Sequence, residues 1–121
     1  MKDSIFRDKS YTYAKRIVRL SQRMIAEQKE FVLSRQLLRS GTAIGALFRE
    51  VEHGRSKAYL VSRMNIALKE TNETNHWLSQ LKDSGHITPE RYDSYSKDAK
   101  ELVKLLSSNV NTIKTESSII I

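Results

Sequence analysis

Residues that interrupt regular secondary structure are scarce in this chain, which has four glycines and one proline among 121 residues. A sheet protein of this size needs many more turn signals, so long helices account for the sequence best. Apolar residues recur every three to four positions in four successive segments, as in amphipathic helices. We therefore predict an all-α fold, namely an antiparallel up-down-up-down four-helix bundle. Residues 1–121 are expected to form one domain. The expected helices cover about 9–28, 32–53, 57–83 and 89–113, followed by a tail over 115–121.

Individual residues mark the boundaries of these helices. Gly54 is expected to cap the second helix in the left-handed conformation, and Ser56 to cap the start of the third. Gly85 should end the third helix. Thr88 and Pro89 should start the fourth, because proline fits the first helical position after a threonine N-cap.

The segment Ser34–Gly54 has two opposite faces. Its apolar residues fall on one side of a helix, and Arg35, Arg39 and Arg49 fall at successive turns on the other. Two glycines four residues apart lie within the same segment. Glycine is less favourable than alanine in a helix by about 1 kcal/mol, so this pair predicts the close approach of another backbone.

The positive charge of the chain is confined to its first half. Residues 1–60 contain 13 Lys and Arg against 6 Asp and Glu, a net +7, whereas residues 61–121 contain 8 of each. A one-sided basic surface is typical of chains that bind nucleic acid or an acidic protein, although many charged helix faces are only solvated. The candidate nucleic-acid-binding residues, on the first two helices, are Lys15, Arg16, Arg19, Arg23, Arg35, Arg39 and Arg49.

The third helix has an unusual stripe roughly opposite its expected core face. Ile66, Glu70, Glu73 and Trp77 recur there at helical spacing. Two acids flanked by an aliphatic side chain and an indole predict a second contact surface, either with a neighbouring helix of the same chain or with another subunit. In the second case, the arginines of the second helix are candidates to pair with the two acids across a subunit interface.

The sequence contains no recognisable catalytic constellation. It has no cysteine, no glycine-rich phosphate loop and no glycine-framed serine. Two Glu-x-x-His spacings, Glu50 to His53 and Glu73 to His76, resemble part of a di-iron motif. The two histidines are separated by about 30 Å along the bundle, and three of the four side chains point away from the apolar faces. We therefore expect no enzymatic activity, no metal and no cofactor.

No segment approaches the roughly 20 apolar residues that span a bilayer, and the amino terminus lacks the apolar run of a signal peptide. No membrane association is expected, and a cytoplasmic location is the default expectation.

Two motifs carry a family resemblance that extends over nearly the whole chain. They are QLLRSGTAIGA at 36–46 and NIALKETNETNHWL at 65–78. The sequence thus resembles the bacterial family of 23S rRNA intervening-sequence proteins, often labelled ribosomal proteins, which includes accessory proteins of diversity-generating retroelements. It departs from the usual pattern at Phe48, where asparagine is more common, and it lacks the Phe-Pro pair that precedes the second helix in many relatives.

The resemblance implies a compact bundle that assembles into a ring-shaped homopentamer, with a positive surface for nucleic acid and no catalytic reaction. The leading hypothesis is a non-enzymatic oligomer that contacts RNA or DNA phosphates without strong sequence specificity. The alternative is a protein–protein scaffold or accessory subunit, for example of a reverse transcriptase, whose arginines serve subunit contacts.

Overall fold

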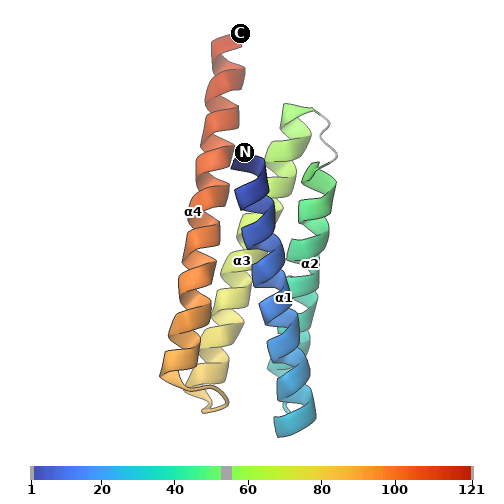
Figure 1. Cartoon of the computed structure of the whole chain (residues 1–121), viewed down its shortest axis with the longest axis vertical. Coiled ribbons are helices and arrows are strands. Elements are labelled where there is room, and N and C mark those ends of the chain that lie inside the picture. Colours follow the sequence, from blue (N-terminus) through green and yellow to red (C-terminus); the bar gives the residue numbers. More distant parts are fainter. Residues whose placement is uncertain (1, 53–55, 121) are drawn as a thin grey trace.

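Four helices form an antiparallel bundle in which each packs against the next along the chain (Figure 1), so the expected all-α fold is confirmed. They are α1 (Lys2–Gln28), α2 (Val32–Glu52), α3 (Lys57–Asp83) and α4 (Pro89–Ile120). Contacts between α1 and α4 are sparser than those between consecutive helices. This computed structural model describes the backbone of residues 2–52 and 56–120 and the side chains of residues 7–47 and 56–114.

Two helices are longer than the sequence pattern indicated. Helix α1 begins at Lys2 and not near residue 9, and α4 continues to Ile120, so the expected tail over 115–121 is helical as far as it is described. Neither extension contains glycine or proline, and an established helix adds one hydrogen bond for each further residue. The C-terminal end of α4 consequently extends beyond the other helices (Figure 1). The expected cap Gly54 lies outside the described residues.

The expected start and end of α3 and the expected start of α4 are confirmed. Ser56 Oγ accepts a hydrogen bond from the Tyr59 N–H at 3.1 Å, and Thr88 Oγ1 accepts one from the Arg91 N–H at 3.2 Å. Gly85 follows the end of α3 with a φ of 79°, in the left-handed region that glycine adopts without a steric penalty. Local sequence therefore determines where the chain turns between α3 and α4.

The start of α2 is capped by a residue that the sequence pattern did not single out. The Glu30 carboxylate accepts hydrogen bonds from the Ser34 N–H at 2.8 Å and the Leu33 N–H at 3.2 Å. It also accepts one from the Ser34 hydroxyl at 2.9 Å. Burial alone raises the pKa of Glu30, but these hydrogen bonds together outweigh it and lower that pKa below its ordinary value of 4.5. The carboxylate satisfies amide groups that have no partner within the first turn of α2.

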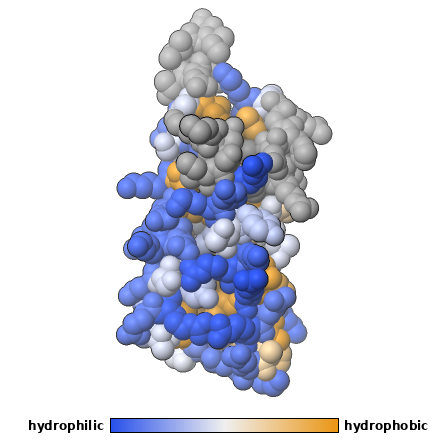
Figure 2. Space-filling model, in the orientation of Figure 1, coloured by the Kyte–Doolittle hydropathy of each residue, from blue (hydrophilic) through white to orange (hydrophobic). Residues whose placement is uncertain are grey.

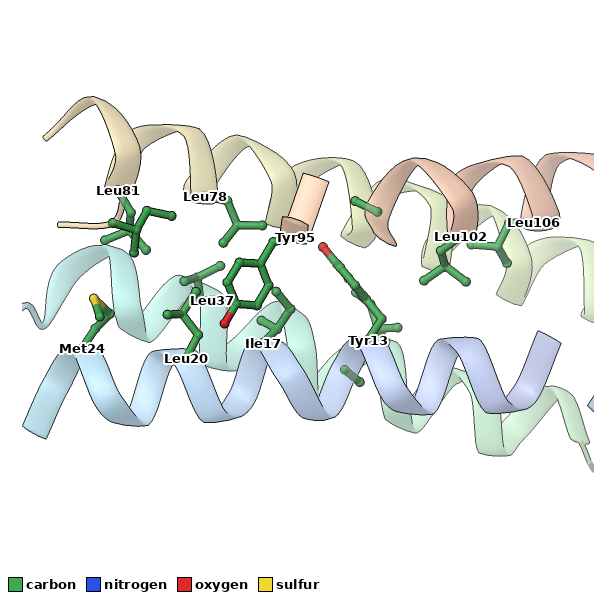
Figure 3. Packing of buried hydrophobic residues seen from close by; sticks show 14 of the residues in the cluster. Tyr13, Ile17, Leu20, Met24, Leu37, Leu78, Leu81, Tyr95, Leu102 and Leu106 are labelled. Carbon is green, nitrogen blue, oxygen red and sulfur yellow. The ribbon is translucent and has the colours of Figure 1, made fainter. Parts of the chain in front are cut away.

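The core is a continuous cluster to which all four helices contribute (Figure 3). Each large aliphatic side chain buried in this way contributes about 1.5–3 kcal/mol relative to leaving it in water. The labelled members of the cluster are Tyr13, Ile17, Leu20, Met24, Leu37, Leu78, Leu81, Tyr95, Leu102 and Leu106.

Helices α1 and α2 pack closely at Gly41. A Cβ atom at that position would lie 2.9 Å from Ile17 Cγ2 and 3.5 Å from the Ala14 carbonyl oxygen. Since real Cβ atoms do not approach neighbours to 2.9 Å, this helix spacing depends on glycine. At Gly45 a Cβ atom would meet only Ala14 Cβ, at an ordinary 3.6 Å. The expected close approach is confirmed at the first glycine, whereas the second has room for a methyl group.

The two glycines of α2 should therefore respond oppositely to alanine. We expect Gly41→Ala to lower the free energy of unfolding by about 1–2 kcal/mol, because the fully buried, β-branched Ile17 must shift. Gly45→Ala should raise it by about 0.5–1 kcal/mol through helix propensity. Urea unfolding followed by circular dichroism at one fixed protein concentration measures both. Equal effects of the two variants would contradict the packing described above.

Glu30→Ala should lower the free energy of unfolding at pH 7 by about 1 kcal/mol, because two amide groups of α2 lose their acceptor. The folded-state pKa of Glu30 lies below 4.5, so the wild-type advantage is complete above about pH 4.5. It is then lost as the pH falls through that lower folded pKa. Urea unfolding of both proteins at pH 7 and pH 3 checks this, and an unchanged difference at pH 3 would contradict it.

Candidate functional site

The basic residues of α1 divide into two groups. Lys15, Arg19 and Arg23 are exposed, whereas Arg16 is half-buried and turned toward α4. The Arg16 guanidinium pairs with the Asp98 carboxylate, donates to Ser94 Oγ at 3.1 Å and lies 4.2 Å from the centre of the Tyr95 ring. Arg16 therefore joins α1 to α4, and the structure does not bring it into the exposed basic face.

The arginines of α2 also differ from one another. Arg39 Nη1 donates to Glu70 Oε2 at 3.0 Å, and Arg39 Nη2 donates to Glu73 Oε2 at 3.2 Å. The Arg35 guanidinium lies 5.9 Å from the Phe31 ring and has no carboxylate partner among the described side chains. The side chain of Arg49 lies outside the described residues.

The acids of the α3 stripe face α2 of the same chain. Only 11% of the Glu70 side chain is exposed, and the sequence had placed it roughly opposite the core. A helical wheel assumes one buried direction, whereas α3 packs between α2 and α4 and is buried from two sides. Trp77 is half-buried against the core, and Ile66 remains 38% exposed. The pairing of Arg39 with Glu70 and Glu73, considered above as a contact between subunits, is thus made within one chain.

A groove of about 530 Å³ runs between α1 and α2, and we call it the α1/α2 groove. Lys15 and Arg19 line it, and no aspartate or glutamate does. No carboxylate pairs with either cation among the described side chains. The complete lining is Tyr11, Ala14, Lys15, Val18, Arg19, Gln22, Gly41, Thr42, Gly45 and Ala46.

The α1/α2 groove combines apolar surface with cations. Several of its lining residues are small, among them Ala14 and Gly41, while the long Lys15 and Arg19 side chains are exposed. Tyr11 is 59% exposed, and Lys15 Nζ lies 5.9 Å from the centre of its ring. Figure 2, in the orientation of Figure 1, shows hydrophilic surface with hydrophobic patches between the polar side chains. The lining of the α1/α2 groove suits a ligand that has both anionic and flat apolar parts.

A smaller hollow between α1 and α4 has a different charge. It measures about 200 Å³, and its lining includes Asp8, Asp98 and Glu101. A hydrogen bond from Lys9 lowers the pKa of Glu101, and the two side chains pair at 3.0 Å. Burial raises the pKa of the Tyr13 phenol in the same lining, and the charge of Asp98 adds to this effect. The carboxylates of this hollow make it a poor site for an anion.

Helix α4 has a row of lysines that the sequence analysis missed. Lys97, Lys100 and Lys104 are exposed at three- and four-residue spacing, which the sequence pattern could have revealed. They share a hollow of about 480 Å³ with Asp93 and Glu101. The sequence analysis also missed Tyr11, whose i, i+4, i+8 spacing with Lys15 and Arg19 places all three on one face.

Within the described part of the chain, no three His, Cys, Asp or Glu side chains are grouped so as to hold a metal ion. His76 is exposed and stacks edge-on against Trp77 with ring centres 5.1 Å apart, while His53 lies outside the described residues. None of the described helices combines the length and apolar character that crossing a membrane requires.

The fold and its charge define the class of this protein, a small four-helix bundle with a basic, acid-free groove. The chain belongs to the 23S rRNA-intervening sequence protein family, whose sequence profile it matches over residues 2–108. It is similar to a Bacteroides thetaiotaomicron protein of the S23 ribosomal protein family, whose crystal structure is described as that of a protein with unknown function. That structure has 50% sequence identity and a TM-score of 0.87, and the match covers 92% of this chain and 99% of the other. A comparison with curated proteins gave no match.

Arg39→Ala should lower the free energy of unfolding by about 1–2 kcal/mol, because it leaves the poorly exposed Glu70 carboxylate without its cation. Glu73→Ala should lower it by less than about 1 kcal/mol, since Glu73 is 37% exposed. Urea unfolding at one protein concentration compares the two variants.

Adding Glu70→Gln to Arg39→Ala should recover part of the loss, because the unpaired charge is removed. Light scattering provides the control on assembly. An Arg39→Ala protein with unchanged unfolding but a smaller oligomeric mass would show that Arg39 serves a subunit contact and not the α2–α3 pair.

Proposed function

We propose that this protein binds nucleic acid through phosphate contacts made by the exposed cations of α1 and α2. The observation that carries the proposal is the α1/α2 groove, where Lys15 and Arg19 stand together without any carboxylate in the lining. Unpaired cations at a surface attract a polyanion, and each phosphate that they neutralise releases a condensed counterion. The chain belongs to a family described as 23S rRNA-intervening sequence proteins, and this supports nucleic acid as the polyanion.

Neighbouring cations extend the proposed contact beyond the groove. Arg23 lies one helical turn beyond Arg19, and its contact with Glu27, at 3.9 Å between two exposed side chains, is too weak to neutralise it. Arg35 adds a further exposed cation on α2. Because these side chains would contact backbone phosphates, the proposed binding discriminates little between sequences. The proposed role is binding without catalysis.

The competing proposal is a scaffold or accessory subunit, for example of a reverse transcriptase, whose arginines form contacts between proteins. The exposed Ile66 favours some such contact on α3. The arginines are a weaker argument for it, because Arg39 already pairs with Glu70 and Glu73 within the chain. The ring of five subunits that the family resemblance implies is compatible with both proposals.

Neutralising the two groove cations with Lys15→Gln and Arg19→Gln together should weaken nucleic-acid binding roughly tenfold at low salt. The slope of log affinity against log salt should become shallower by about 1.4 to 1.8, from two contacts at about 0.7 each on single strands or 0.9 each on duplex. Fluorescence anisotropy of labelled RNA and DNA at several salt concentrations measures both quantities.

Lys100→Gln with Lys104→Gln is the matched control, because it removes the same charge from exposed positions on α4. It should leave the slope within the error of wild type. Equal losses in the two double variants would mean that overall charge, and not the groove, attracts the nucleic acid. No binding by the wild-type protein at low salt would overturn the proposed function altogether.

A further inference from the structure

We propose that the ligand of the α1/α2 groove is a single strand of nucleic acid, with one base stacked on Tyr11 and the adjoining phosphates on Lys15 and Arg19. This inference rests on the proposed function and specifies the form of nucleic acid. Its first support is the width of the groove, and its second is the chemistry of the lining.

The groove is too narrow to receive a duplex. The absence of a side chain at Gly41 lets α1 lie directly against α2, and helices packed in this way have axes about 8–10 Å apart. A DNA duplex is wider than its own major groove, which measures about 12 Å. A duplex is therefore too wide to enter between α1 and α2 and can touch only the outer ends of the side chains that line the α1/α2 groove. A single base is a flat ring system, and stacked bases are separated by about 3.4 Å. A base can therefore enter where a duplex cannot.

The lining provides for both parts of a nucleotide. Ala14, Val18 and Ala46 offer apolar surface, which a base can contact and a phosphate cannot. Lys15 and Arg19 supply the charge that a phosphate requires. Proteins that bind single strands without sequence preference combine a cationic groove with aromatic side chains on which the bases stack.

Tyr11 is the aromatic side chain in the right place. With 59% of its surface exposed, it is among the most exposed large hydrophobic residues of the described chain, and it lines the groove directly. Lys15 Nζ lies 5.9 Å from its ring centre, so a base on this ring brings its own phosphate within reach of a cation. Stacking on an aromatic ring does not depend on the identity of the base, in agreement with weak sequence specificity.

A helix from a second copy of the chain is the main competing occupant. To fit, it would have to bring carboxylates to Lys15 and Arg19 and cover the Tyr11 ring. The described part of the chain has an exposed aromatic residue outside the groove, Phe31, which is 43% exposed and lies 5.9 Å from the Arg35 guanidinium. Phe31 is therefore a matched control for Tyr11, with a similar ring and a similar neighbouring cation.

The experiment measures fluorescence anisotropy of a labelled oligouridylate of about ten nucleotides and of an RNA duplex of the same length. The wild-type protein should bind the single strand more tightly than the duplex. Tyr11→Ala should weaken single-strand binding about fivefold or more and leave duplex binding unchanged, whereas Tyr11→Phe and Phe31→Ala should stay within about twofold of wild type. The loss in Tyr11→Ala should persist at high salt, because stacking is not screened.

Other outcomes separate the failure of this inference from that of the proposed function. In one outcome, the protein binds single strand and duplex with equal affinity, and Tyr11→Ala has no more effect than Phe31→Ala. If the Lys15 and Arg19 double variant still binds weakly in that case, the groove contacts phosphates only. If Tyr11→Ala lowers the oligomeric mass in light scattering, the groove is a contact between copies of the chain. Either result overturns this inference, and the absence of any binding at low salt overturns the proposed function as well.

Discussion

The packing of α1 against α2 at Gly41 is the constraint on which the surface of this protein depends. Because Gly41 has no side chain, Ile17 occupies the space where a Cβ atom would otherwise lie, and the two helices lie in close contact. Gly41 also lines the α1/α2 groove, together with other small residues such as Ala14 and Ala46, and the exposed cations Lys15 and Arg19 line it from α1. Core packing and the shape of the groove therefore have one cause, and a substitution that separates the helices would alter both.

Ion pairs determine which cations remain available at the surface. Arg16 pairs with Asp98 on α4, and Arg39 pairs with Glu70 and Glu73 on α3, so these two arginines connect neighbouring helices. Lys15 Nζ lies 5.9 Å from the centre of the Tyr11 ring and pairs with no carboxylate among the described side chains. The net charge of +7 indicates an anionic partner, but it does not locate the binding surface, because part of that charge is neutralised between helices.

Much of the fold could be predicted from the sequence, because helix periodicity and the caps at Ser56 and Thr88 are local signals. The sequence also named Glu70 and Glu73 as candidate partners for the arginines of α2. It could not show that Arg39 pairs with them within one chain, since they lie 31 and 34 positions away and α3 is buried from two sides. The groove was beyond prediction for a similar reason. Tyr11 resembles any surface tyrosine until α1 is placed against α2, because the groove that it lines is formed by both helices.

Ultraviolet crosslinking of the wild-type protein to single-stranded RNA tests most directly whether nucleic acid binds in the α1/α2 groove. Mass spectrometry identifies the crosslinked peptides without any substitution. The structure predicts crosslinks concentrated at the groove residues Tyr11, Gly41, Thr42, Gly45 and Ala46. Crosslinks concentrated on α4, near the exposed lysines Lys97, Lys100 and Lys104, would contradict it.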